Sequence, residues 1–152
     1  MLENVALLKP VYRFLLAQAS DLVRAKQYQF AVILAQAACE LATEESVNNL
    51  LRRWADVSRE AVMSDLKRGA TLDDFKVRDL YGVLARDYPA GDPQRGVPPA
   101  PWWQVWKASL ALRHDVAHNG LQVTEMQARG CVESCRQYID HLVAMAERAL
   151  TA

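Results

Sequence analysis

The sequence predicts an all-α fold, a bundle of four long helices plus a shorter one, formed as a single domain over residues 1–152. Apolar residues recur at the three- and four-residue spacing of amphipathic helices over most of the chain. No stretch alternates apolar and polar residues as a half-buried strand would. One segment rich in proline and glycine, at about 88–101, interrupts the pattern. We therefore expect helices packed around one core.

The first half of the chain is predicted to form two long helices. The first spans Val5 to Lys26, and Pro10 either lies within its first turns or marks its true start. The second spans Gln27 to about Trp54, and it either continues or restarts near Ser58 and runs to Arg68. Its apolar residues fall on one stripe: Phe30, Ile33, Leu34, Ala37 and Leu41.

A shorter helix is predicted next, between two residues that typically mark helix ends. Gly69 has the character of a C-terminal cap of the preceding helix. Thr71 has that of an N-cap, with Asp73 and Asp74 in the first turn, where the helix dipole favours acidic side chains. This helix is expected to reach about Asp87.

The segment from Tyr88 to Pro101 contains five prolines and two glycines, a composition that excludes helix and strand alike. It is either a surface connection or a short disordered segment. Pro101 suits the first turn of the next helix, which is expected over Trp102 to about Asn119 and is ended by Gly120.

The last helix is predicted to begin after Thr124 and to run to about Leu150. Thr124 and Gln127 have the spacing of a capping box. Cys131 and Cys135 share one face of this helix, and with Cys39 they are the only cysteines. Such a set is not typical of a disulfide framework or a metal knuckle, and for Cys131 and Cys135 we expect buried small hydrophobic side chains, with a redox pair as the alternative.

Composition limits the possible partners. The formal net charge is +0, so no overall field attracts the chain to nucleic acid or to an anionic membrane. The N-terminus does not have the pattern of a signal peptide, and the longest uncharged apolar stretch, Gln27 to Cys39, is too short to cross a bilayer. We expect a cytoplasmic protein without a membrane partner, and no cofactor motif is present.

The segment from Arg113 to Gly120 carries the most chemistry. On a helix, Arg113 falls in an apolar sector formed by Trp102, Trp103, Trp106, Leu110, Val116 and Ala117. A charge in that sector needs a partner, and Glu40 and Glu44 are the candidates. His118 lies at the end of the same helix and can transfer protons near neutral pH.

Two simpler interpretations remain open. Arg113 can form a structural ion pair with Glu40, while His118 complements the helix dipole. Alternatively, His114 and His118, four residues apart, can hold a metal ion, with His141 or Asp115 as a third ligand. We predict no metal site. The tryptophans are expected in the core or at a dimer contact, and Arg52, Arg53, Arg59, Lys67 and Arg68 on a solvated face.

Arg113, the polar residue His114, and His118 followed by Asn119 and Gly120 resemble the R-x(4–6)-H motif of HEPN domains, the higher eukaryotes and prokaryotes nucleotide-binding family. The run Ala31–Leu41 is similar to the second helix of that family, in which a Gln and a Glu often recur. The resemblance extends over about residues 5–150 and covers a short motif and the order of helices.

The resemblance implies a helical homodimer whose motif helices face each other. Many such proteins are metal-independent ribonucleases in toxin–antitoxin pairs or phage defence. Arg113 and His118 would then be catalytic, with His114, Asn119 and Glu40 in support, RNA as substrate, and an antitoxin or nucleotidyltransferase-type protein as partner. Some members carry a modifiable Tyr two residues after the His, where this chain has Gly120. The alternative is a non-catalytic helical module that binds a protein or a nucleotide.

Overall fold

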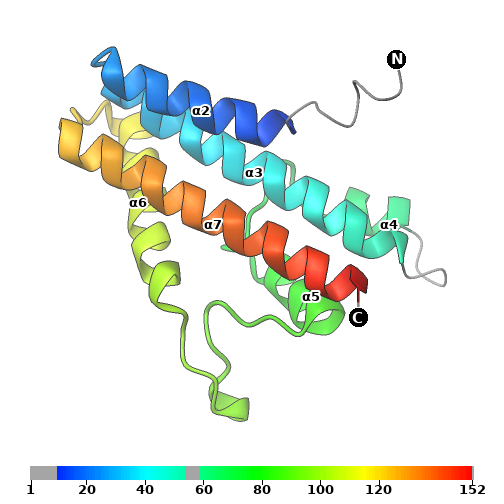
Figure 1. Cartoon of the computed structure of the whole chain (residues 1–152). Coiled ribbons are helices and arrows are strands. Elements are labelled where there is room, and N and C mark those ends of the chain that lie inside the picture. Colours follow the sequence, from blue (N-terminus) through cyan, green and yellow to red (C-terminus); the bar gives the residue numbers. More distant parts are fainter. Residues whose placement is uncertain (1–9, 54–58, 152) are drawn as a thin grey trace, which may run out of the picture.

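The computed structural model describes residues 10–53 and 59–151, and these residues form a helical assembly (Figure 1). The elements in chain order are α2 Val11–Arg24, α3 Tyr28–Arg52, α4 Arg59–Asp65, α5 Phe75–Ala85, the 3-10 turn η1 Pro93–Arg95, α6 Pro101–Asn119 and α7 Glu125–Thr151. The all-α prediction is confirmed. Four helices are long, but the described residues contain two short helices, α4 and α5, where one was expected.

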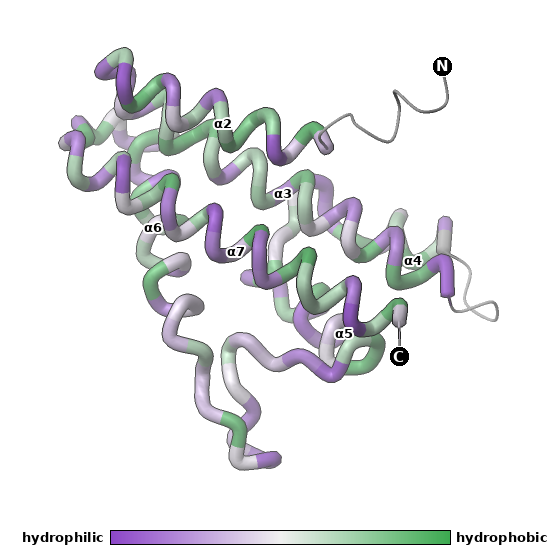
Figure 2. The backbone as a smooth tube through the Cα atoms, in the orientation of Figure 1, coloured by the Kyte–Doolittle hydropathy of each residue, from purple (hydrophilic) through white to green (hydrophobic). Residues whose placement is uncertain are grey.

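Helices α2, α3 and α7 lie side by side in one layer, and α6 crosses behind them at a steep angle (Figure 1). Helix α3 packs most extensively against α2 and α7. Hydrophobic and hydrophilic residues alternate around the long helices (Figure 2). The core therefore lies between the α2–α3–α7 layer and helices α5 and α6.

The buried faces of α3 are lined by small side chains. Ala31, Ala35, Ala38 and Ala42 are completely buried, and their size allows the neighbouring helices to approach closely. The larger residues of the predicted apolar stripe lie elsewhere: Phe30 is 62% exposed, and Ile33 and Leu41 are also exposed. Much of the stripe that periodicity assigned to the core therefore faces outward.

Helix α2 begins directly after Pro10, so the second of the two alternatives for this proline is confirmed. The Pro10 carbonyl accepts hydrogen bonds from the amides of Arg13 and Phe14, at 3.0 and 3.2 Å. Proline suits this place because its missing amide would have no partner in the first turn. The predicted start at Val5, and the predicted end and restart at Trp54 and Ser58, lie outside the described residues.

The two predicted caps between α4 and α5 are wrong. Helix α4 ends at Asp65, so Gly69 caps no helix and instead lies in the following turn with a φ of +73°. Asp74, not Thr71, is the N-cap of α5, and its carboxylate accepts the Lys76 amide at 2.8 Å. Thr71 forms the preceding turn, in which its hydroxyl accepts the Asp73 amide.

The proline-rich segment is an ordered connection. Contrary to the prediction, it contains the short 3-10 turn η1 and an isolated bridge between Asp92 and Val97. The Ala100 amide donates to the Pro89 carbonyl at 2.9 Å, which closes the segment. Pro101 then opens α6, and Gly120, with a φ of +62°, ends it as predicted.

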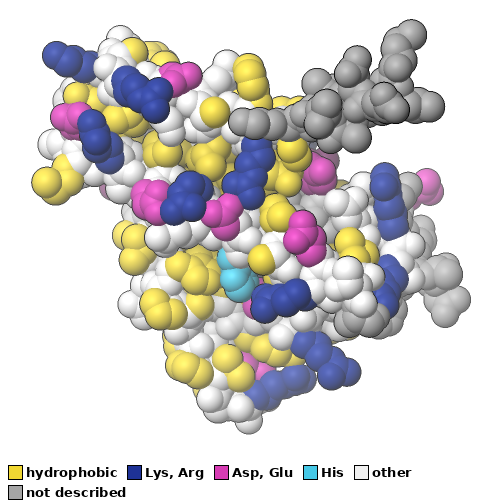
Figure 3. Space-filling view, in the orientation of Figure 1, with side chains coloured by type: hydrophobic (Ala, Val, Ile, Leu, Met, Phe, Trp, Pro, Cys, Tyr) yellow, Lys and Arg dark blue, Asp and Glu magenta, His cyan; other side chains and the backbone are white. Residues whose placement is uncertain are grey.

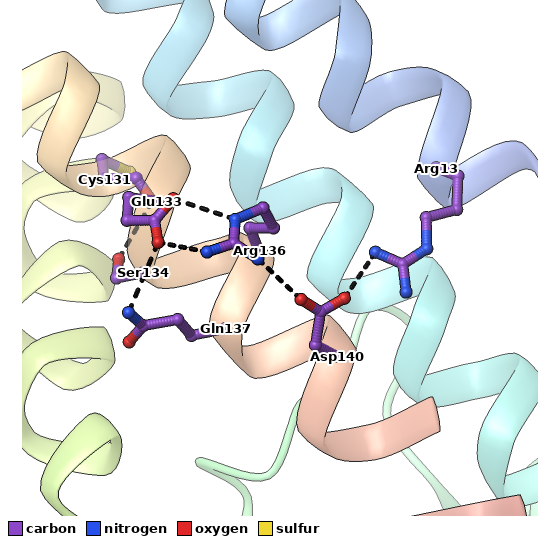
Figure 4. A network of polar contacts seen from close by, with 7 residues as sticks. All are labelled: Arg13, Cys131, Glu133, Ser134, Arg136, Gln137 and Asp140. Carbon is purple, nitrogen blue, oxygen red and sulfur yellow. Dashed lines mark hydrogen bonds and ion pairs between the residues drawn. The ribbon is translucent and has the colours of Figure 1, made fainter. Parts of the chain in front are cut away.

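Helix α7 begins with the predicted capping box. The Thr124 amide donates to the Gln127 side chain at 3.0 Å, and the Gln127 amide donates to the Thr124 hydroxyl at 3.2 Å. The outer face of α7 carries a chain of ion pairs (Figure 4). In this chain Asp140 accepts from Arg136 on its own helix and from Arg13 on α2, at 2.8 and 2.7 Å.

Candidate functional site at the end of helix α6

The first half of α6 is fixed in the core by aromatic side chains. Trp106 is fully buried and stacks on Tyr138 of α7, with ring centroids 4.3 Å apart. Trp103 is also buried and contacts Trp106, whereas Trp102 is half-buried. The expectation that these tryptophans are core residues is confirmed for Trp103 and Trp106. They set the direction in which the second half of α6 leaves the bundle.

Arg113 lies where α6 passes α3, and its predicted partner Glu40 is confirmed. The Arg113 Nη2 lies 3.3 Å from the Glu40 Oε1, and the Arg113 side chain is 34% exposed. The Arg113 Nε is buried and has no hydrogen-bond partner among the described residues. The alternative partner, Glu44, is exposed. Arg113 is thus held by one long contact and retains unused donors.

The apolar sector around Arg113 is narrower than periodicity predicted. Val116 is buried, but Ala117 is exposed, and the polar Ser109 takes a buried place instead. Arg113 therefore lies at the edge of the core. An arginine there can bury its stem and keep part of its guanidinium in contact with solvent.

Glu40 is partly enclosed on the side away from Arg113. A side chain at Gly69 would place its Cβ 3.2 Å from the Glu40 Oε2, so glycine allows this close approach. Burial raises the pKa of Glu40, and the positive charge of Arg113 only partly offsets that effect. Sequence reasoning missed this role of Gly69 because a glycine that admits a distant side chain has the same local signature as a cap.

His114, His118 and Asn119 lie on the exposed end of α6. The rings of the two histidines are neighbours, with centroids 4.4 Å apart and planes tilted by 45°. Asn119 donates to Asp115 at 3.4 Å. The structure therefore brings His114 and His118 together at the surface.

Arg113 and His118 do not face the same way in one chain. Residues on an α-helix are separated by about 100°, so a spacing of five residues turns the side chain by about 140°. Arg113 points along α3 toward Glu40, whereas His118 lies on the exposed side near the helix end. A site that uses both groups on one phosphate needs either rearrangement or a second chain.

A second polar contact joins the same two helices inside the core. The Gln36 amide donates to the Ser109 hydroxyl at 2.9 Å, and both residues are buried. The Gln36 Oε1 has no partner among the described residues. Gln36 donates a hydrogen bond to Ser109, and Glu40 accepts one from Arg113. The two residues on each helix are one turn apart, so the contacts follow one another along the α3–α6 interface.

The three cysteines and His141, the other candidate reactive side chains, are buried or engaged in contacts within the bundle. Cys131 and Cys135 are buried thiols, as expected, and Cys39 is buried as well. Hydrogen bonding to Cys135 together with burial raises the pKa of Cys131 well above its usual value. His141, considered as a third metal ligand, contacts Asp87 at 2.9 Å, and its ring lies against the Trp102 ring with the two planes tilted by 41°. No group of three or more metal-binding side chains is arranged around one point among the described residues.

The basic side chains expected on a solvated face are exposed at Arg52, Arg53, Lys67 and Arg68, while that of Arg59 lies outside the described side chains. On the face shown in Figure 3, basic and acidic side chains are interspersed, which agrees with the net charge of +0. None of the described helices is long and apolar enough to cross a membrane.

No family model matches the chain, and searches of the curated proteins and of the solved structures give no significant match. The geometry of α6 and its neighbours is therefore the basis on which a function can be proposed for the chain.

Proposed function

We propose that the chain is a HEPN-like endoribonuclease that cleaves single-stranded RNA without a metal ion, as a homodimer that serves as a toxin or phage-defence effector. One observation carries this proposal. A partly exposed Arg113 with unused donors precedes by five residues a solvent-exposed His118 at the end of the same helix. A group suited to phosphate binding and a group suited to proton transfer therefore lie on one helix, on sides that differ by about 140°.

The two residue types are suited to cleavage of RNA by its own 2′-hydroxyl. A base must remove the proton of that hydroxyl, and an acid must protonate the departing 5′-oxygen. Histidine can serve in either role near neutral pH. The planar guanidinium of Arg113 can bind the non-bridging phosphate oxygens, whose negative charge grows in the transition state.

A dimer would supply both roles at once. One chain offers a single His118, turned by about 140° from its own Arg113. Two copies of α6 that face each other would place two arginines and two histidines around one RNA phosphate. His114 and Asn119 would border that site, and Glu40 would hold Arg113 until RNA binds.

The outward face of α3 supports such an assembly. Phe30, Ile33, Ala37 and Glu40 follow the three- and four-residue spacing of one helix face. Phe30 and Ile33 are 62% and 37% exposed, so a second chain could bury two large apolar side chains on this face. Because Glu40 contacts Arg113, this face of α3 adjoins the first residue of the Arg113–His118 motif. A second copy of the chain would cover it.

The Arg113–Glu40 contact also favours a second candidate function, a non-catalytic helical module that binds a protein or a nucleotide. In that case the ion pair only joins α3 to α6, and His118 is a surface residue. Under the ribonuclease proposal an antitoxin or nucleotidyltransferase-type protein would be the partner, but Gly120 occupies the place of the modifiable Tyr, so modification at that place is not proposed.

The decisive experiment is cleavage of labelled single-stranded RNA by the purified chain in the presence of EDTA. We expect cleavage, and we expect Arg113→Ala and His118→Ala each to lower the rate by about a hundredfold or more. Arg129→Ala is the matched control, because Arg129 is an exposed arginine paired with Glu125 on α7. Folded wild-type protein that leaves RNA intact would favour the binding module.

The composite site can be tested separately by light scattering at micromolar concentration. We expect a dimer, and Phe30→Glu should shift the protein toward monomer and reduce cleavage in parallel. A wild-type protein that is monomeric yet cleaves RNA at full rate would contradict the composite site while preserving the ribonuclease.

A further inference from the structure

The two exposed histidines of α6 form a pair with the geometry of a chelate. His114 and His118 are one helical turn apart, so they project from the same face. Their ring centroids are 4.4 Å apart. Neither ring is hydrogen-bonded to another described side chain, so rotation of the side chains can turn a nitrogen of each ring toward one point.

We propose that His114 and His118 together bind a borderline divalent transition-metal ion of the Zn²⁺ or Cu²⁺ class, and that the bound ion inhibits the ribonuclease. The binding part depends only on the geometry of α6. The inhibitory part rests on the proposed function, because it requires His118 to take part in cleavage.

The chemistry of the pair selects this class of ion. Neutral imidazole nitrogens bind Zn²⁺ and Cu²⁺ and are poor ligands for Mg²⁺ or Ca²⁺, which prefer oxygen. Zinc–nitrogen bonds are about 2.0–2.1 Å long, so one ion can reach two rings that already lie side by side. Because no third protein ligand adjoins the pair in the described residues, water would complete the coordination.

The position of the pair on the helix adds to the attraction for a cation. His118 lies in the last turn of α6, where carbonyl groups without helical partners and the helix dipole create a negative potential, and His114 lies one turn earlier. Asp115 lies between them in sequence and adds a negative charge on the same exposed end. No lysine or arginine lies between Arg113 and the end of α6.

The third histidine of the chain shows the contrast. His141 is half-buried, contacts Asp87 through its Nε2 at 2.9 Å and packs against the Trp102 ring at a centroid distance of 4.6 Å. A metal ion would have to displace both contacts. His141 therefore serves as an internal control for any metal effect.

Occupation of the pair would stop proton transfer at His118. A nitrogen whose lone pair binds a metal ion cannot accept the proton of an RNA 2′-hydroxyl, and the coordination bond would also hold the ring in place. Removal of the ion by a chelator would restore the free imidazole. Cleavage in EDTA and inhibition by zinc are thus expected of the same site.

The binding test is calorimetric titration of the tag-free full chain with Zn²⁺, and with Mg²⁺ for comparison. We expect Zn²⁺ but not Mg²⁺ to bind, and His114→Ala and His118→Ala each to weaken zinc binding by about tenfold or more, because each removes one of two ligands. His141→Gln should leave the affinity within about twofold.

A matched double variant separates spacing from histidine content. His118→Ala combined with Asn119→His keeps three histidines but turns the second imidazole by about 140° from the first, which breaks the chelate. It should bind zinc as weakly as His118→Ala. Wild-type affinity in this variant or in either single variant, or lost affinity in His141→Gln, would overturn the site.

Inhibition is read from the RNA cleavage assay, with Zn²⁺ added and then removed by EDTA. We expect reversible loss of cleavage with zinc and none with Mg²⁺ at the same concentration. Full cleavage by zinc-saturated protein would overturn the inhibitory role. Zinc binding through both histidines in a chain that cleaves no RNA would refute the proposed function and leave the metal site in place.

Discussion

The two halves of α6 use their side chains in opposite ways. The first half buries Trp103 and Trp106 against α7, where stacking on Tyr138 fixes the helix in the bundle. The second half exposes His114 and His118 and keeps only Val116 fully in the core. One helix thus has a first half that packs in the core, the anchoring half, and a second half whose side chains are mostly exposed. Arg113 lies between the two halves.

This division separates stability from chemistry. Side chains in the anchoring half contribute packing that is lost when they are removed, whereas exposed polar side chains contribute little to the free energy of unfolding. The end of α6 can therefore carry reactive groups without a large cost in stability. The tryptophan half keeps those groups at a constant position relative to α3.

The largest expected effect is at the anchoring half. Trp106→Ala should lower the free energy of unfolding by about 3–5 kcal/mol, since it leaves a cavity against Tyr138. His118→Ala should change it by less than about 0.5 kcal/mol, because the ring is exposed. Urea denaturation of both variants measures the difference, and similar values for the two would show that the halves are not distinct.

A smaller effect is expected where α6 ends. Gly120 has a φ of +62°, and a Cβ there would meet no atom within 4 Å, so Gly120→Ala should cost about 1 kcal/mol through backbone strain alone. Gly130, inside α7, has equally open space, and Gly130→Ala should stabilise the protein by about 0.5–1 kcal/mol. In thermal unfolding, Gly120→Ala should lower the Tm and Gly130→Ala should raise it. A change of the same sign in both variants would rule out strain at Gly120.

The smallest effect is expected at the contact between Arg113, which lies between the two halves of α6, and Glu40 of α3. Burial raises the pKa of Glu40 above its usual 4.5, so the folded state binds this proton more tightly than the unfolded state. Its contribution to stability is therefore present at low pH and is lost as pH rises through and above 4.5. As pH rises through and above 4.5, the free energy of unfolding of the wild type should therefore fall relative to that of Glu40→Gln, whose side chain does not titrate. A pH-independent difference would mean that Arg113 fully compensates the burial.

Helix positions followed from sequence where local signals were strong. Pro101 and Gly120 bound α6, and Thr124 with Gln127 begin α7, because each signal acts on the backbone within a few residues. The partner of Arg113 was also predicted, since a charge near an apolar sector needs a counter-charge and α3 offered few.

Two failures came from residues whose role depends on distant parts of the chain. Gly69 was expected to cap a helix, but it admits the Glu40 side chain from α3. Much of the stripe from Phe30 to Leu41 was expected to be buried, but the alanines on the other faces of α3 allow closer packing and take the core. Periodicity identifies an apolar face but does not say which neighbour covers it.

The sequence by itself determined the helical class and the ends of the last two helices, because these depend on local spacing and side-chain chemistry. Only the tertiary structure decided which face of α3 is buried and that Gly69 adjoins Glu40. The physical reason is that a helix buries the face on which its neighbours can pack most closely. Those neighbours come from parts of the chain that are far apart in sequence.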